Sequence, residues 1–285
     1  MRHFMRSSEK RIFVPTDFSK PAAAALQYAI YIANRTNSTI HLTHFAEREE
    51  LIQKTKTPSA YKSKLRLLEK KLEDCKNKSG AAFRIYTDLI TTTESVSSQI
   101  QEYGAKINAE LACIGTYGSD SKPSKYNFGN NAEKLVHTVD FPVLSCRKVK
   151  SPIKFKNLLL PIDFTKYTIE KVERIIHFAT NFDSTIHLVA VSEFLEEFIT
   201  KRSELEHKLE EAAEIIRKNG LKCTTETIRH DLVSNSILIY AKEIDADMLV
   251  IMSKEENFFN HLFFGSRINK VISYSEIPVL IFKRE

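Results

Sequence analysis

Two kinds of segment alternate along this chain: short apolar runs, and longer segments in which apolar residues recur at helical spacing. Short continuous apolar runs predict β-strands, and the run at 111–115 is apolar throughout, as expected of a strand covered on both faces. Between these runs apolar residues recur at helical spacing, and Ser19 followed by Pro21 is a typical helix start. In the first half we expect strands at 12–14, 39–45, 81–86, 111–115 and 142–147, and helices at 20–33, 59–78, 95–103 and 130–138.

The same order returns in the second half of the chain. The expected strands are 157–161, 184–191, 222–228, 248–252 and 278–283, and the expected helices are 166–181, 200–219, 233–243 and 266–275. Strands that alternate with helices predict an α/β fold, in which a parallel sheet carries helices on both faces.

The sequence repeats along with the pattern. Val-Pro-Thr-Asp-Phe-Ser at 14–19 returns as Leu-Pro-Ile-Asp-Phe-Thr at 160–165, and Ser-Thr-Ile-His-Leu occurs at both 38–42 and 184–188. A repeat of about 140 residues has the size of one complete domain. We therefore expect two homologous domains, 1–150 and 151–285, joined by a linker that Ser151-Pro152 interrupts.

Composition narrows the class of protein. A hydrophobic fraction of 42% is ordinary for a globular chain. No apolar run approaches the ~18 residues of a membrane span, and the N-terminus lacks the apolar core of a signal peptide, so we expect a cytoplasmic protein. The four cysteines show no paired spacing, and no His/Cys cluster indicates a metal. The net charge of +6 comes without a basic and aromatic pattern, which argues against nucleic acid as a partner.

Three features of the first half fall where strands of a parallel sheet end, the usual place for ligands. Asp17 follows the first strand, where its carboxylate can accept hydrogen bonds from a ribose or a base, or can cap the next helix. Gly115 and Gly118 end the fourth strand, and Gly129 and Asn130 open a helix, whose N-terminus attracts anions. Turns alone also favour glycine. Three of the chain's seven glycines lie in this stretch, however, which favours phosphate binding.

These motifs, in this order and in two copies, resemble the universal stress protein family over the whole chain. The resemblance implies two five-stranded parallel sheets of order 3-2-1-4-5. It also implies that some members hold ATP through the motif G-x2-G-x9-G-[S/T], with Mg²⁺ as an accompanying ion. By the same resemblance, Asp17 and Phe45 would flank the adenosine, and the phosphates would be held by Gly115, Gly118, Gly129 and Asn130.

The chain departs from the family motif in both halves. Ten residues instead of nine separate Gly118 from Gly129, and Asn130 replaces Ser or Thr, although its amide still donates hydrogen bonds. Lys122 and Lys125 in this loop are candidates to neutralise phosphates. In the second half, Met252 and Glu255 replace the two strand glycines, whereas Asp163, Gly265 and Ser266 remain and Val191 aligns with Phe45. We therefore predict an eroded site there that does not hold ATP well.

Two classes of function stay open at this stage. The leading prediction is a non-catalytic, nucleotide-responsive regulatory protein with an adenine nucleotide, ATP, in the first domain. The alternative is an interaction protein that has lost nucleotide binding, and a slow ATPase would have only Asp17 and Asp120 as nearby carboxylates. In the family the last strand mediates dimerisation. The resemblance therefore implies that 141–146 and 277–282 pair within one chain as a pseudo-dimer, which is compatible with a further homodimer and with protein partners.

Overall fold

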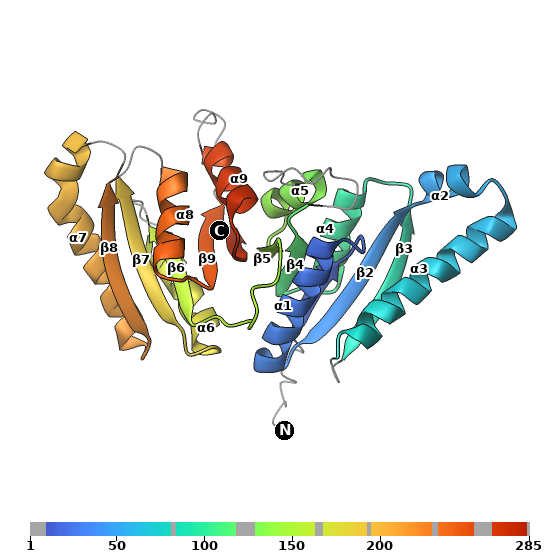
Figure 1. Ribbon diagram of the computed structural model, residues 1–285, viewed down its shortest axis with the longest axis horizontal. Coiled ribbons are helices and arrows are strands. Elements are labelled where there is room, and N and C mark those ends of the chain that lie inside the picture. The colour runs from blue at the N-terminus through green and yellow to red at the C-terminus, as the bar shows by residue number, and fades with distance from the viewer. Residues whose placement is uncertain are drawn as a thin grey trace, which may run out of the picture.

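The computed structural model describes residues 10–80, 84–117, 129–162, 168–192, 195–229, 233–253 and 264–283. The first half comprises β1 (Arg11–Pro15), α1 (Lys20–Thr36), β2 (Thr39–Glu47), α2 (Arg48–Thr55), α3 (Pro58–Lys78), β3 (Ile85–Thr92), α4 (Val96–Lys106), β4 (Leu111–Gly115), α5 (Asn130–Thr138) and β5 (Val143–Cys146). The second half comprises β6 (Asn157–Ile162), α6 (Thr168–Thr180), β7 (Thr185–Ser192), α7 (Leu195–Lys218), β8 (Lys222–Arg229), α8 (Val233–Glu243), β9 (Met248–Ser253), α9 (Phe264–Tyr274) and β10 (Val279–Lys283). The halves lie side by side along the longest axis (Figure 1).

All strands belong to one ten-stranded sheet with the order β3-β2-β1-β4-β5-β10-β9-β6-β7-β8. Within each half the neighbouring strands are parallel, so the predicted α/β fold and the order 3-2-1-4-5 are confirmed. The halves join where β5 and β10 run antiparallel, with Leu144 opposite Leu280. Each half thus covers the apolar edge strand of the other, an edge that would otherwise be open to further strand pairing.

Helices cover both faces of this sheet because successive strand residues point to opposite sides. Ile12 and Val14 join a core cluster with residues of α1, α3, α6 and α7, whereas Phe13 joins a second cluster with residues of α4, α5, α8 and α9. Each cluster contains residues from both halves, so the two apolar layers run through the junction. Among the described residues, every helix is too short or too polar to span a bilayer.

Helix α1 begins and ends at the residues that its sequence favours. Ser19 is the N-cap, and its Oγ accepts a hydrogen bond from the N–H of Ala22 at 3.2 Å, as predicted. The helix ends at Asn37, which adopts a left-handed conformation with φ of 52° and donates its N–H to Ala33 O. Since the helix start is fixed in this way, the turn between β1 and α1 is fixed as well.

The first half differs from the sequence-based expectations in one strand and one helix. Strand β3 covers Ile85–Thr92 and not 81–86, because it is an edge strand whose half-buried residues carry few large apolar side chains. The prediction for 81–83 lies outside the described residues. Helix α2 was not predicted, since Leu51 is its only buried residue and an apolar period therefore cannot be seen in its sequence.

Candidate functional site

The turn after β1 places Asp17 at the carboxyl edge of the sheet. Its Oδ1 accepts a hydrogen bond from the backbone N–H of Ser19 at 3.0 Å, which closes a short Asx turn. Because Ser19 is the N-cap, the interpretation of Asp17 as the helix cap is wrong. A carboxylate has about four acceptor positions, and the N–H of Ser19 takes one of them. Asp17 can therefore hold the turn and accept hydrogen bonds from a ligand.

Phe18 holds the same turn in an unusual conformation. Its φ is +64°, in the left-handed region that bulky residues rarely adopt. The N–H of Phe18 donates to Thr16 Oγ1 at 3.0 Å, and its ring centroid lies 4.6 Å from that of His44. His44 Nδ1 in turn lies 2.7 Å from the carbonyl oxygen of Thr16, so β2 holds the turn from the side. Backbone strain that is held by several contacts is typical of binding sites.

Phe45 points its ring away from this turn. The side chain is buried, and its ring makes edge contacts with Phe13 and Tyr103 at centroid distances of 6.3 and 6.0 Å. The backbone N–H and C=O of Phe45 point in another direction than its ring. Thr43 O faces β1, because it accepts the N–H of Thr16 at 2.8 Å. Groups two residues apart on a strand face the same neighbour, so the N–H and C=O of Phe45 point past the end of β1 at Pro15. What Phe45 offers a ligand is therefore its backbone.

Gly115 ends β4 and is packed tightly by α1. A Cβ atom built on it would lie 2.8 Å from Ala22 N and 2.9 Å from Pro21 C, distances that side chains do not tolerate. The missing side chain thus allows the first turn of α1 to approach the end of β4. This packing alone explains a glycine at position 115. It also keeps the first turn of α1 close to the carboxyl end of β4.

Helix α5 begins beside that strand end. Gly129 is its N-cap, and the N–H of Gly129 donates to Thr116 O at 2.9 Å. Thr116 is buried, with its N–H donating to Cys146 O at 2.9 Å and its Oγ1 3.1 Å from Ser145 Oγ. The start of α5 is thereby fixed to the sheet, with Asn130 exposed at its first position. The first-turn N–H groups of a helix have no carbonyl partner within the helix, so those of α5 are donors that suit an anion.

Lysines of α3 add positive charge near the turn. Lys71 Nζ lies 5.4 Å from the centroid of the Phe18 ring. Lys71 and Lys64 are also close enough for their charges to lower the pKa of His44. The sequence predicted a helix at 59–78, and its position beside β2 and β3 became visible only in the fold.

Parts of the predicted site lie outside the described residues. These are Gly118, Asp120, Lys122 and Lys125 in the first half, and Asp163 and Glu255 in the second. Met252 is described, and its partly buried side chain packs against the core where Gly115 leaves room for α1. Gly265 and Ser266 lie in the first turn of α9. Among the described residues, no group of three or more His, Cys, Asp or Glu side chains could hold a metal ion.

Comparison with known proteins identifies the family. The model of the universal stress protein family matches residues 9–147 and again residues 154–283, and the chain belongs to this family. A universal stress protein of Methanocaldococcus jannaschii is 25% identical over 142 residues, which are 46% of this chain and 83% of the relative. The predicted family and its tandem arrangement are confirmed.

Solved structures show the same fold. The crystal structure of a universal stress protein from Archaeoglobus fulgidus DSM 4304 has a TM-score of 0.70 at 18% identity, over 98% of this chain and 100% of that chain. A universal stress protein from Archaeoglobus fulgidus that was solved in complex with dAMP has a TM-score of 0.36 at 20% identity, over 45% of this chain and 97% of that chain.

His44 makes the stability of this site depend on pH. Burial lowers the pKa of His44 below 6.5, although the hydrogen bond to Thr16 and the charge of Asp17 act in the opposite direction. The unfolded chain then binds a proton more readily than the folded one, so stability that is present above pH 6.5 is lost as the pH falls through the pKa of the folded state. We expect urea unfolding to show lower stability at about pH 5.5 than at about pH 7.5.

The variant His44→Gln should show a weaker pH dependence than the unmodified chain. Part of the dependence remains, because burial also lowers the pKa of His187. His187→Gln is the matched control in the second half, and the double variant should be nearly flat over this range. An unchanged slope of stability against pH in His44→Gln would contradict the assignment of this pH dependence to His44.

Proposed function

We propose that this chain is a non-catalytic, nucleotide-responsive binding protein that holds ATP at the carboxyl edge of its first domain, residues 1–150. One observation carries the proposal: Gly129 N–H is bonded to Thr116 O, so the start of α5 lies against the end of β4. The N–H groups of this helix start and the positive end of its dipole provide a place for phosphates. Asn130 adds an amide donor at its first position.

The remaining groups fit an adenosine. The backbone N–H and C=O of Phe45, which point past the end of β1, match the donor and acceptor edge of adenine. The carboxylate of Asp17 can accept hydrogen bonds from ribose hydroxyls. Lys64 and Lys71 add cations on the side of α3. Mg²⁺ would accompany the phosphates as an ion that ATP carries with it.

The proposal includes no catalytic step. Asp17 holds the turn through the N–H of Ser19 and would accept hydrogen bonds from ribose, which is a binding role. The nucleotide would therefore act by binding, since a ligand that prefers one arrangement of the two halves shifts the population toward it. In the second domain, residues 151–285, Met252 occupies the place of Gly115, and we propose that this domain does not hold ATP.

One observation favours the alternative of an interaction protein without nucleotide. The packing of Pro21 and Ala22 over Gly115 requires a glycine there whether or not a phosphate binds. The test is therefore direct binding. Equilibrium dialysis of the intact chain at millimolar ATP should show one bound nucleotide per chain, and mass spectrometry of natively purified protein should detect adenylate. No binding at that concentration leaves the alternative.

The variant Asn130→Asp locates the site. A carboxylate at the first turn of α5 suits the helix dipole, so the fold is kept, but it repels phosphates. We expect the affinity for ATP to fall about tenfold, since like charges a few Å apart near a protein surface repel by more than about 1 kcal/mol. Ser266→Asp makes the same change at the start of α9 and should leave the affinity unchanged. Equal losses in both variants would contradict a site confined to the first domain.

A further inference from the structure

A pocket of about 140 Å³ lies where the two halves meet. The first half contributes Lys10, Arg11 and Glu110 at the starts of β1 and β4, and the second half contributes Arg174 and His177 near the end of α6. The starts of these parallel strands lie at the edge opposite the nucleotide site. The pocket and that site share no residue. Its remaining lining is largely apolar, with Ile12, Ile32, Leu111, Phe178, Leu280 and Phe282.

The second half has the same arrangement of strands at the position that corresponds to the pocket. In the first half the N–H of Glu110 donates to Arg11 O at 3.0 Å, and in the second half the N–H of Asp247 donates to Asn157 O at 2.8 Å. Glu110 and Asp247 each stand directly before the fourth strand of their half, β4 and β9. The two places therefore correspond residue by residue along the strands.

The helices beside these strands correspond as well. At the end of α1 the N–H of Ser38 donates to Ala33 O at 3.3 Å, and at the end of α6 the N–H of Ser184 donates to Ala179 O at 3.3 Å. With Ser38 aligned to Ser184, counting back along the two chain segments gives the counterparts of four residues that line the pocket. Arg174 corresponds to Tyr28, His177 to Tyr31, Ile32 to Phe178 and Thr36 to Phe182.

In the second half this place is filled by the ring of Phe155 from the linker. Phe155 is fully buried, and its ring centroid lies 5.9 Å from Tyr28, 5.4 Å from Tyr31, 5.7 Å from Phe178 and 5.2 Å from Phe182. These four rings are the counterparts of the four pocket residues above. The pocket is therefore the equivalent, in the first half, of a space that holds an aromatic ring in the second.

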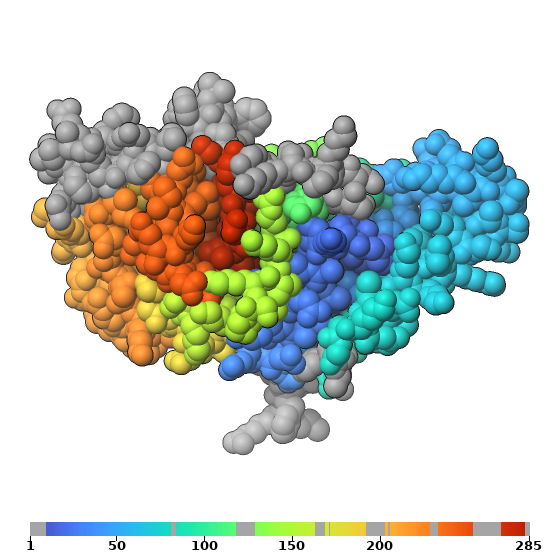
Figure 2. Space-filling view, in the orientation of Figure 1, coloured from blue at the N-terminus to red at the C-terminus, as the bar shows by residue number. Residues whose placement is uncertain are grey.

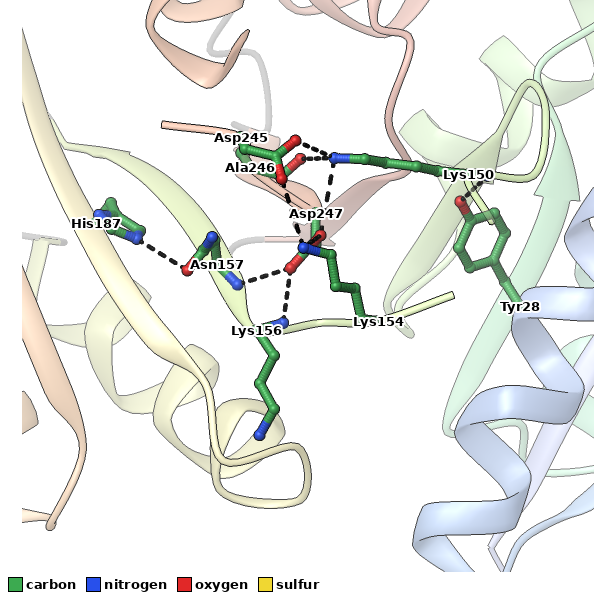
Figure 3. A network of polar contacts seen from close by, with 9 residues as sticks. All are labelled: Tyr28, Lys150, Lys154, Lys156, Asn157, His187, Asp245, Ala246 and Asp247. Atoms are coloured by element: carbon green, nitrogen blue, oxygen red, sulfur yellow. Dashed lines mark hydrogen bonds and ion pairs between the residues drawn. The ribbon is translucent and has the colours of Figure 1, made fainter. Parts of the chain in front are cut away.

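The linker also closes the polar side of that space (Figure 3). Lys154 Nζ lies 3.5 Å from Asp247 Oδ1, Lys150 Nζ lies 2.6 Å from Asp245 Oδ1, and the N–H of Lys150 donates to the hydroxyl of Tyr28 at 3.1 Å. Figure 2 shows the linker crossing the surface between the two halves. In the second half, cations from the linker thus meet the carboxylate before β9.

The charge is arranged differently around the pocket of the first half. Three cationic side chains, Lys10, Arg11 and Arg174, line it against the single carboxylate of Glu110. Arg11 Nη1 donates to Ile107 O at 2.9 Å, and Arg174 pairs with Glu170 at 3.2 Å, so the protein holds both guanidinium groups in place. A guanidinium has five N–H donors, so that of Arg11 can donate to a ligand as well as to Ile107 O. The excess of positive charge favours an anionic occupant.

We infer that this pocket binds a small aromatic carboxylate. The ring takes the place that Phe155 fills in the second half, and the carboxylate lies toward Lys10 and Arg11. The size agrees, because a protein cavity of about 150 Å³ accepts benzene. The bound anion contacts residues of both halves and so stabilises their junction.

Calorimetric titration of the intact chain with benzoate tests this inference, with benzyl alcohol as a neutral ligand of the same shape. Benzoate should bind at least about fivefold more tightly than the alcohol, as expected for one charge-assisted contact. Lys10→Gln should weaken benzoate about fivefold and leave the alcohol unchanged. Thr36→Trp fills the pocket with a side chain larger than the phenylalanine of its counterpart, Phe182, and should abolish binding of both ligands.

Lys70→Gln on the exposed side of α3 is the matched control and should bind benzoate like the unmodified chain. Circular dichroism establishes that each variant is folded, and Lys10→Gln remains informative if Thr36→Trp does not fold. Equal affinity for benzoate and benzyl alcohol, or an affinity that Lys10→Gln leaves unchanged, would overturn the inference. So would full binding by a folded Thr36→Trp.

Discussion

Replacing Asp247 with alanine is expected to lower the free energy of unfolding by about 3 kcal/mol, because the change leaves buried polar groups without partners. The side chain of Asp247 is 1% exposed. Its Oδ2 accepts the N–H groups of Lys156 at 2.8 Å and Asn157 at 2.9 Å. Its Oδ1 has no hydrogen bond among the described residues, but Lys154 and Lys150 lie 3.5 and 3.8 Å away and balance its charge.

The neighbouring residue provides the control for this prediction. Asp245 pairs with the same two lysines, at 2.6 Å from Lys150 and 3.4 Å from Lys154, but its side chain is 69% exposed. Exposed ion pairs contribute little, so Asp245→Ala should cost far less than Asp247→Ala. Urea unfolding followed by circular dichroism measures both. Equal losses would show that the lysine charges, and not the two buried N–H groups, account for the effect.

Asp247→Asn separates these contributions further. Asparagine keeps one acceptor oxygen for the N–H groups of Lys156 and Asn157 but removes the negative charge. We therefore expect a loss between those of the two alanine variants. In this variant Asp245 alone would attract Lys150 and Lys154.

The fold could be predicted wherever the apolar pattern of one element is sufficient to define it. The run at Leu111–Gly115 and the helix at Asn130–Thr138 were predicted with the bounds that the structure shows. Edge strand β3 and helix α2 could not be, since their burial depends on neighbours distant in the sequence and leaves no clear period in their own residues. The pairing of β5 with β10 agrees with the arrangement that the family resemblance implied.

The site was predicted less completely than the fold. Sequence motifs pointed to Asp17 and Gly129, and the structure brings the end of β1, the end of β4 and the start of α5 to one edge. The role of Phe45 could not be assigned to side chain or backbone, since that depends on which face of β2 a residue occupies. No sequence motif singles out His44. Its bond to Thr16 follows from the alignment of β2 beside β1, which no local pattern specifies.

Gly115→Ala is expected to lower the free energy of unfolding by about 2–3 kcal/mol, the usual range for an overpacked core. The added Cβ would lie 2.8 Å from Ala22 N and 2.9 Å from Pro21 C, and a backbone cannot rotate away as a side chain can. Gly104→Ala is the control. Its Cβ would meet the ring of Phe141, the nearest atom being 2.5 Å away, and this partly buried ring can move. Thermal and urea unfolding should rank Gly115→Ala as the more damaging change.

Gly115→Ala also distinguishes the two explanations for a glycine at this position, packing against α1 and close approach of a phosphate. If Gly115 serves packing, α1 must shift in Gly115→Ala, and stability and ATP affinity fall together because Asp17 and Ser19 move with the helix. If it serves only close approach of a phosphate, ATP affinity falls while the urea midpoint stays unchanged. The contacts with Pro21 and Ala22 predict the first result. An unchanged midpoint would show that α1 yields without cost, and the glycine would then be explained by the nucleotide alone.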